Sequence, residues 1–165
     1  MRSSRRLIRL AIYLFLSIGM ICETAGQNLS RKKSELITSQ VDSVFQEMLV
    51  FAENLDLKKL SLGVDDRHGA GFISGGKYHS TFASLLERME SQVQDISRQQ
   101  IVIGQKKITV LTDTIVLLTA TGEATAIADD GRQIKANFDW SFIYQQVGKD
   151  WKVIYSHQSV SQSNP

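Results

Sequence analysis

The chain has 165 residues, a hydrophobic fraction of 42% and a formal net charge of +2 at pH 7. This length is enough for one domain with its own core and is short for two. Four arginines and Glu23 give residues 1–26 a net charge of +3, so the rest of the chain carries −1. That remainder has no cationic excess for binding nucleic acid, and we expect no nucleic-acid partner.

The first 26 residues have the layout of a secretory signal peptide. A basic start precedes the uncharged run Leu10–Cys22 and the small residues Thr24-Ala25-Gly26. The run has 13 residues, fewer than the ~20 that cross a bilayer as a helix; an uncleaved anchor is the alternative. Cys22, the only cysteine, leaves with this segment, so the mature chain has no disulfide. We expect an exported, periplasmic or secreted protein, bacterial in origin, without membrane contact after cleavage.

The next part of the chain predicts two helices separated by an irregular stretch. Residues 27–35 are polar and indicate a flexible start, and residues 36–160 form a single predicted domain followed by a tail, 161–165. Apolar residues from Ile37 to Leu55 recur at helical spacing, as do those over 82–96, with Ser80 or Thr81 as N-cap. Glycines between these helices indicate a small hairpin around Gly75-Gly76.

Four long alternating segments complete the domain, over residues 101–111, 114–128, 133–147 and 151–160. Alternation with short turns predicts an antiparallel meander. Helices gathered on one side of such a sheet make an α+β domain, and long strands twist and curve. We therefore expect a cone-shaped, strongly curved antiparallel sheet wrapped around the N-terminal helix.

The loop Asp129-Asp130-Gly131 favours a hairpin that sets small residues opposite aromatic rings, for example Gly122 opposite Phe138. Such pairs leave room for a cavity inside the cone. The alternative is a two-residue turn, Asp130-Gly131, which would turn Glu123 inward. We prefer the first register because it buries no bare carboxylate.

The last turn, Gly148-Lys149-Asp150, favours pairing Tyr144 with Tyr155, Phe142 with His157 and Trp140 with Ser159. His157 then lies at the end of an aromatic wall inside the cone. Imidazole titrates near neutrality, so His157 is the candidate acid–base residue; a structural hydrogen bond or a ligand contact are its other interpretations. The candidate ligand-binding residues are Trp140, Phe142, Tyr144, Tyr155 and Ser159.

Two further patterns bear on partners. Asp65-Asp66-Arg67-His68, taken with His79, lacks the spacing of zinc ligands, so solvated loop charges are the preferred interpretation and no metal or cofactor is expected. Segments 101–103, 108–111 and 115–118 are apolar on both faces. A sheet with helices on one side would need a polar outer face, so these segments predict a homodimer through the outer sheet face.

The ending of the chain, Trp-Lys-Val-Ile-Tyr-Ser-His-Gln-Ser from Trp151 to Ser159, resembles the nuclear transport factor 2-like superfamily. The resemblance is to its SnoaL-like and ketosteroid-isomerase-like bacterial branch and spans about Leu36 to Val160. It implies the cone fold and a choice among isomerases, dehydratases, cyclases, transport adaptors and dimerisation modules. The isomerase members pair a helix tyrosine with a sheet aspartate, whereas this helix presents Phe45 and Met48.

These patterns lead to one expected function and two alternatives. The expected function is an exported domain that binds a small apolar or aromatic molecule in its cone. The first alternative is an acid–base enzyme of the isomerase or dehydratase type that uses His157. The second is a dimerisation module whose cone is filled by its own side chains.

Overall fold

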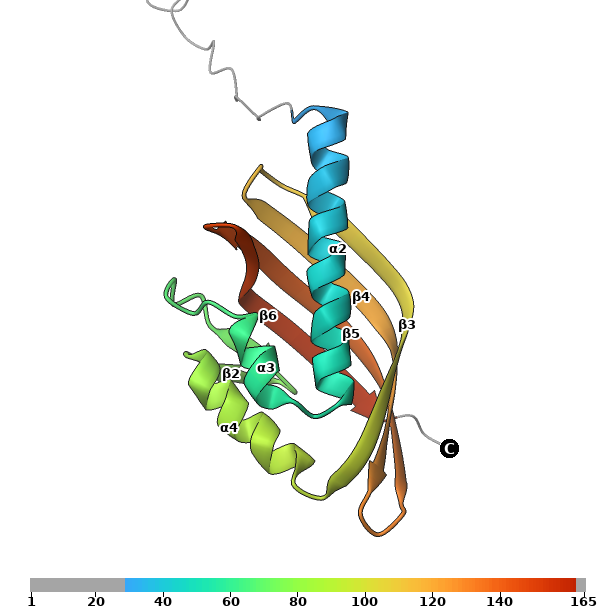
Figure 1. Cartoon of the computed structure of the whole chain (residues 1–165). Helices are drawn as coiled ribbons and strands as arrows, with labels where there is room; N and C mark the ends of the chain where they lie inside the picture. The colour runs from blue at the N-terminus through green and yellow to red at the C-terminus, as the bar shows by residue number, and fades with distance from the viewer. Residues whose placement is uncertain (1–28, 163–165) are drawn as a thin grey trace, which may run out of the picture.

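A computed structural model describes residues 29–162 of the chain (Figure 1). The predicted signal peptide, 1–26, lies outside these residues, and export stays a prediction. The described elements, in chain order, are α2 (Arg31–Glu53), α3 (Leu57–Leu62), β1 (Phe72–Ser74), β2 (Lys77–His79), α4 (Phe82–Val93), β3 (Ile96–Val110), β4 (Ile115–Ala128), β5 (Gln133–Val147) and β6 (Asp150–Gln162).

The six strands form one sheet in the order β2-β1-β6-β5-β4-β3. Strands β3 to β6 pair antiparallel, which confirms the predicted meander. Strand β1 runs parallel to β6, so the six-stranded sheet as a whole is mixed. Figure 1 shows the sheet curving around α2, which lies across one face. The predicted α+β architecture is therefore confirmed.

Helix α2 begins earlier than the sequence pattern indicated. The backbone N–H of Lys33 donates to the Ser30 hydroxyl at 3.3 Å, so Ser30 caps the helix and Arg31 is its first residue. An ion pair between Arg31 and Glu35, 2.8 Å apart, joins successive turns on the exposed side. The prediction of a flexible start is thus wrong for residues 31–35.

At the C-terminal end of the domain, β6 continues to Gln162, past the predicted domain boundary at residue 160.

Helix α3 lies in the stretch that was expected to be irregular. The Asp56 carboxylate caps it by accepting from the Lys59 N–H at 3.0 Å, and Leu57 and Leu60 are buried. The sequence analysis did not predict this six-residue helix because the glycines of the surrounding segment indicated an irregular structure. The β1–β2 hairpin is confirmed, with Gly75 and Gly76 at φ of 54° and 74° in its turn.

The core lies between α2 and the concave face of the sheet. Ile37, Val41 and Phe45 of the predicted α2 stripe are buried, and Val44 and Met48 are partly buried. They meet alternate residues of β4, β5 and β6. Each fully buried aliphatic or aromatic side chain contributes ~1.5–3 kcal/mol relative to an exposed one. The buried core residues are Ile37, Val41, Phe45, Phe72, Leu85, Val116, Leu118, Ala120, Phe142, Tyr144, Trp151 and Val153.

The β4–β5 register is the preferred one from the sequence. Ala120 lies opposite Trp140 and Gly122 opposite Phe138, while Glu123 is exposed on the outer face. The connecting loop closes with Gly131 at φ 84°, as a three-residue hairpin loop requires. The inward placement of Glu123 is therefore excluded.

The β5–β6 register differs from the prediction because the turn has two residues, Gly148 and Lys149, and because β6 contains a bulge. Ile143 pairs with Tyr155 and Tyr144 with Val153, so Ile154 is an extra residue without a partner on β5. One extra residue reverses the faces of everything beyond it. The three predicted pairs are accordingly wrong: Tyr144 faces Val153, Phe142 faces Ser156, and Trp140 faces Gln158.

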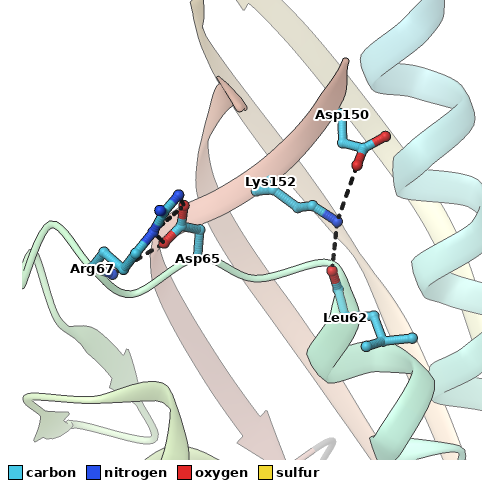
Figure 2. A network of polar contacts seen from close by, with 5 residues as sticks. All are labelled: Leu62, Asp65, Arg67, Asp150 and Lys152. Atoms are coloured by element: carbon cyan, nitrogen blue, oxygen red, sulfur yellow. Dashed lines mark hydrogen bonds and ion pairs between the residues drawn. The ribbon is translucent and has the colours of Figure 1, made fainter. Parts of the chain in front are cut away.

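Backbone and side-chain hydrogen bonds hold the connection from α3 to β1 against the start of β6 (Figure 2). Val64 bridges Val153, and the ammonium of Lys152 donates to the Leu62 carbonyl at 2.7 Å and lies 3.9 Å from the Asp150 carboxylate. The Asp65 carboxylate accepts from the Arg67 guanidinium at 2.5 Å, and only 8% of its side chain is exposed. The interpretation of residues 65–68 as solvated loop charges is therefore wrong for Asp65.

Gly122 is required where β4 passes beneath Phe138. A Cβ at this position would lie 2.7 Å from the Phe138 ring and would also meet the Val102 carbonyl. We expect Gly122→Ala to lower the free energy of unfolding by ~1–3 kcal/mol, the usual cost of overpacking. Gly104→Ala is the matched control, because its Cβ would meet nothing closer than 3.5 Å. Equal urea midpoints for the two variants would contradict the close approach.

The Asp65–Arg67 pair predicts a pH dependence of stability. The hydrogen bond from Arg67 lowers the pKa of Asp65 to about 2. Because the folded-state pKa lies below the unfolded one, the stabilisation is complete above about pH 4 and is lost as the pH falls towards 2. Unfolding of Asp65→Asn should depend less on pH in this window than wild type, and Arg67→Gln should match it. Parallel wild-type and variant curves would contradict the assignment.

Candidate functional site

A cavity of about 170 Å³ lies between α2 and the concave face of the sheet. We call it the cone cavity. Most of its lining is apolar, and it comes from the three helices α2, α3 and α4 and from all four long strands. The lining residues are Phe45, Met48, Leu49 and Ala52 of α2, Leu60 of α3, Met89 of α4, Gln99 and Ile101 of β3, Ala124 of β4, Trp140 and Phe142 of β5, and Gln158 of β6.

The cavity stays open because the aromatic rings of β5 pack against one another and face small residues of β4. Trp140 stacks on Phe138 with ring centroids 3.8 Å apart and meets Phe142 edge-on at 6.0 Å. Further along β4, Ala124 lies opposite Ala136, so neither strand fills the space under α2. The sequence-based expectation that small partners leave room beside the rings is borne out.

Three polar groups belong to the wall of the cone cavity. The Gln99 amide donates to the Ala52 carbonyl at 2.5 Å, and the Gln158 amide donates to the Ser156 hydroxyl at 3.3 Å. The indole Nε1 of Trp140 is buried and has no acceptor among the described residues. The sequence reasoning missed Gln158 because the bulge had not been foreseen. It missed Gln99 because residues 96–100 had not been assigned to a strand.

The described lining residues include no acidic, basic or imidazole side chain. Proton transfer requires a titratable group within hydrogen-bond reach of the reacting atom. The wall can therefore enclose an apolar molecule and offer it hydrogen bonds, but it supplies no acid or base.

His157, the candidate acid–base residue, lies on the opposite face of the sheet. It pairs with Ser141 and is exposed, and its Nε2 is 3.5 Å from the Ser159 hydroxyl. It borders an open depression of about 300 Å³ that Asp139 and hydroxyl side chains also line. The prediction that His157 lies inside the cone is wrong, because Ile154 shifts the register before it.

The predicted ligand-binding residues divide into three groups. Trp140 and Phe142 line the cone cavity. Tyr144 is fully buried, its hydroxyl donates to the Met48 sulfur at 3.4 Å, and burial raises the pKa of its phenol. Tyr155 and Ser159 point to the outer face beside His157, again because of the bulge. The structure thus brings together only the first group.

A larger groove, of about 580 Å³, runs outside the cone between α2, α3 and the β5–β6 turn. Several of its charged groups have protein partners. Lys59 pairs with Asp56 at 2.9 Å, and Lys152 bonds the Leu62 carbonyl. We take the cone cavity as the candidate site because its wall is mostly apolar and its described lining residues carry no charge.

Two classes of site are not found in the described part of the chain. Among residues 29–162, no group of three histidine, cysteine, aspartate or glutamate side chains is placed to hold a metal ion. His79 instead packs in the fold, with its Nδ1 3.1 Å from the Ser84 hydroxyl. Within the same residues, no helix combines the length and apolar character needed to cross a membrane.

No protein-family model and no curated protein matches the chain by sequence. Solved structures match it at low identity. A proposed scytalone dehydratase from Novosphingobium aromaticivorans DSM 12444 has a TM-score of 0.71 at 6% identity, covering 82% of this chain and 89% of that one. A nuclear transport factor 2-like superfamily protein from Salmonella enterica serovar Typhimurium has a TM-score of 0.67 at 12% identity, covering 79% and 95%.

A hexachlorocyclohexane dehydrochlorinase from Novosphingobium barchaimii has a TM-score of 0.67 at 9% identity, covering 81% of this chain and 93% of that one. An uncharacterised protein from Caulobacter vibrioides with a cystatin-like fold has a TM-score of 0.63 at 12% identity, covering 78% and 90%. At such identities the likeness concerns the fold. The chain has the nuclear transport factor 2-like, cystatin-like fold.

Proposed function

We propose that the chain is a binding module that holds a small, neutral, apolar or aromatic molecule in its cone cavity. The observation that carries this proposal is a partly open space of about 170 Å³ between α2 and the sheet, with a mostly apolar wall. An engineered apolar cavity of ~150 Å³ in another protein stays dry and takes up benzene. A volume of this order suits a single ring with small substituents.

The polarity of the wall supports a neutral ligand. A charged group moved from water into an apolar cavity needs a partner of opposite charge. The described lining residues offer no such partner, since none of them is ionisable. With the sequence-based expectation of export, the module would act in a periplasm or outside the cell.

The two alternative functions have less support. An acid–base enzyme would need a titratable group at the cavity, and His157 lies on the other side of the sheet. Structural neighbours named as a dehydratase and a dehydrochlorinase fit either binding or catalysis of small molecules in such a fold. A dimerisation module with a filled cone is disfavoured by the open volume.

We also propose that two copies associate through the outer sheet face. Leu117, Ile143 and Tyr155 form one row across β4, β5 and β6 on this face, and each is half-buried. Figure 1 shows α2 on the other side of the sheet. An apolar row on an uncovered sheet face is typical of an interface.

Filling the cone cavity should abolish binding. Ala124 lines the cavity, whereas its neighbour Thr125 points to the outer face. We expect toluene to raise the melting temperature of wild type, because a ligand that binds only the folded state stabilises it. Ala124→Leu should remove this shift.

Thr125→Leu is the matched control, because it adds an equally large side chain one residue away on the opposite face. It should keep the toluene shift of wild type. A shift that survives in Ala124→Leu, or its absence from wild type, would count against binding in the cone.

The outer face can be tested separately by light scattering on the chain from Gln27 onward. Leu117→Lys should convert a dimer to a monomer, because it places a charge in the apolar row. Leu36→Lys is the control, since Leu36 is 58% exposed on α2, away from this face. A wild-type monomer, or a Leu117→Lys dimer, would exclude the proposed interface.

A further inference from the structure

Gln158 brings an amide to the concave face of the sheet, in the wall of the cone cavity. It lies on β6, an interior strand, between Trp140 of β5 and Ser74 of β1. The bulge at Ile154 turns Gln158 inward together with Ser156, which is buried. Because strands flank it on both sides, the Gln158 side chain extends into the space between the sheet and the helices that cover it.

The Gln158 amide uses little of its hydrogen-bonding capacity within the protein. Such an amide has two N–H donors and a carbonyl oxygen with two lone pairs. Its Nε2 donates to the Ser156 hydroxyl at 3.3 Å, and its carbonyl oxygen has no donor among the described residues. That oxygen keeps accessible surface, in contrast to Nε1 of Trp140, which is buried. Polar groups inside proteins are normally hydrogen-bonded, so the Gln158 carbonyl is available to a bound molecule.

Gln99, the other amide of the wall, joins two elements of the fold. Its Nε2 donates to the Ala52 carbonyl at 2.5 Å, and the Ile101 N–H donates to the Glu53 carboxylate at 2.8 Å. Both bonds tie β3, an edge strand, to the end of α2. The Gln99 carbonyl also has no donor among the described residues, but at the sheet edge water can supply one. Gln158 is therefore the better candidate for contact with a ligand.

We propose that the preferred ligand is a neutral, mainly apolar molecule that carries one hydroxyl group, an alcohol or a phenol, which donates to the side-chain carbonyl of Gln158. This inference rests on the proposed function and narrows its ligand class. The described lining residues carry no charge, so the hydroxyl binds in its un-ionised form. Most of the remaining wall is hydrocarbon, aromatic ring or thioether, which suits the apolar part of the molecule.

A hydroxyl matches the free part of the Gln158 amide better than other small neutral groups do. It donates to the carbonyl oxygen and can accept from the second N–H of Nε2, whereas a hydrocarbon forms neither bond. A ketone or an ether can only accept, so it leaves the carbonyl without a donor. Such a ligand would strip water from the carbonyl and replace no hydrogen bond, which weakens binding.

Two probes of nearly the same shape test this class: p-cresol, which carries the hydroxyl, and p-xylene, which has a methyl group in its place. Their affinities for wild type and for Gln158→Met are measured by calorimetry on the chain from Gln27 onward. Methionine keeps the length of the side chain and removes the amide. The substitution should weaken p-cresol binding about two- to tenfold, the range for one net hydrogen bond, and leave p-xylene binding within about twofold. Measuring both probes on both proteins removes their different hydrophobicity from the comparison.

Gln99→Met is the matched control, because it removes the other amide of the same wall. It should lower the free energy of unfolding by loosening β3 from α2, while p-cresol and p-xylene keep their relative affinities within about twofold. A selective loss of p-cresol binding in Gln99→Met and not in Gln158→Met would overturn the assignment. So would a p-cresol affinity that neither substitution changes.

A crystal structure of the wild-type chain with p-cresol does not depend on how either variant folds. The hydroxyl oxygen should lie about 2.5–3.0 Å from the side-chain carbonyl oxygen of Gln158. A p-cresol molecule in the cone whose hydroxyl points away from Gln158 would overturn the inference and leave the binding module standing. If neither probe binds wild type, the proposed function itself fails.

Discussion

One extra residue in β6 decides which chemistry the concave face of the sheet can offer. Ile154 has no partner on β5, so every side chain of β6 beyond it points to the sheet face opposite to the one that an unbroken alternation would give. Trp151 and Val153 face the core before the bulge, and Ser156 and Gln158 face it afterwards. Without the bulge, His157 would enter the cone and the fold would hold an imidazole beside its aromatic wall. With it, the cavity loses its only candidate acid or base.

The same bulge explains how the edge of the sheet is completed. Ser156 lies between Phe72 of β1 and Phe142 of β5, and all three face inward. A small side chain between two rings lets both pack without strain, whereas a tyrosine there would collide with them. The parallel addition of β1 to β6 thus fits the shifted register. Packing at the edge and chemistry in the cavity are consequences of one backbone feature.

The empty space under α2 is costly in itself, because protein interiors are normally close-packed. A cavity removes dispersion contacts from its walls. Ala124 lines this cavity and leaves space that a larger residue would fill. A domain that served only to dimerise would have no need of such a space. This cost is the physical basis for proposing that the cone cavity holds a ligand.

Much of the fold could be predicted because local signals agreed with the global arrangement. The alternation of β4 and β5 and the three-residue loop ending at Gly131 left one register that kept Glu123 in water. The β6 register could not be predicted in this way. Val153, Ile154 and Tyr155 are all apolar, so the sequence does not show which of them is the extra residue, and a strict alternation from Trp151 to His157 sends His157 inward. Trp140 and Phe142 were correctly placed at the cavity because they lie on β5, whose register with β4 was predicted. Tyr155, His157 and Ser159 were placed on the wrong face because they follow the bulge in β6.

The central claim is that the cone holds an apolar space that a small molecule can enter. A crystal of the chain from Gln27 onward under xenon pressure tests it most directly, since xenon enters dry apolar cavities. The account predicts a xenon site bounded by Met48, Met89 and Trp140. Side chains that close this space, or ordered waters that fill it in place of xenon, would contradict it.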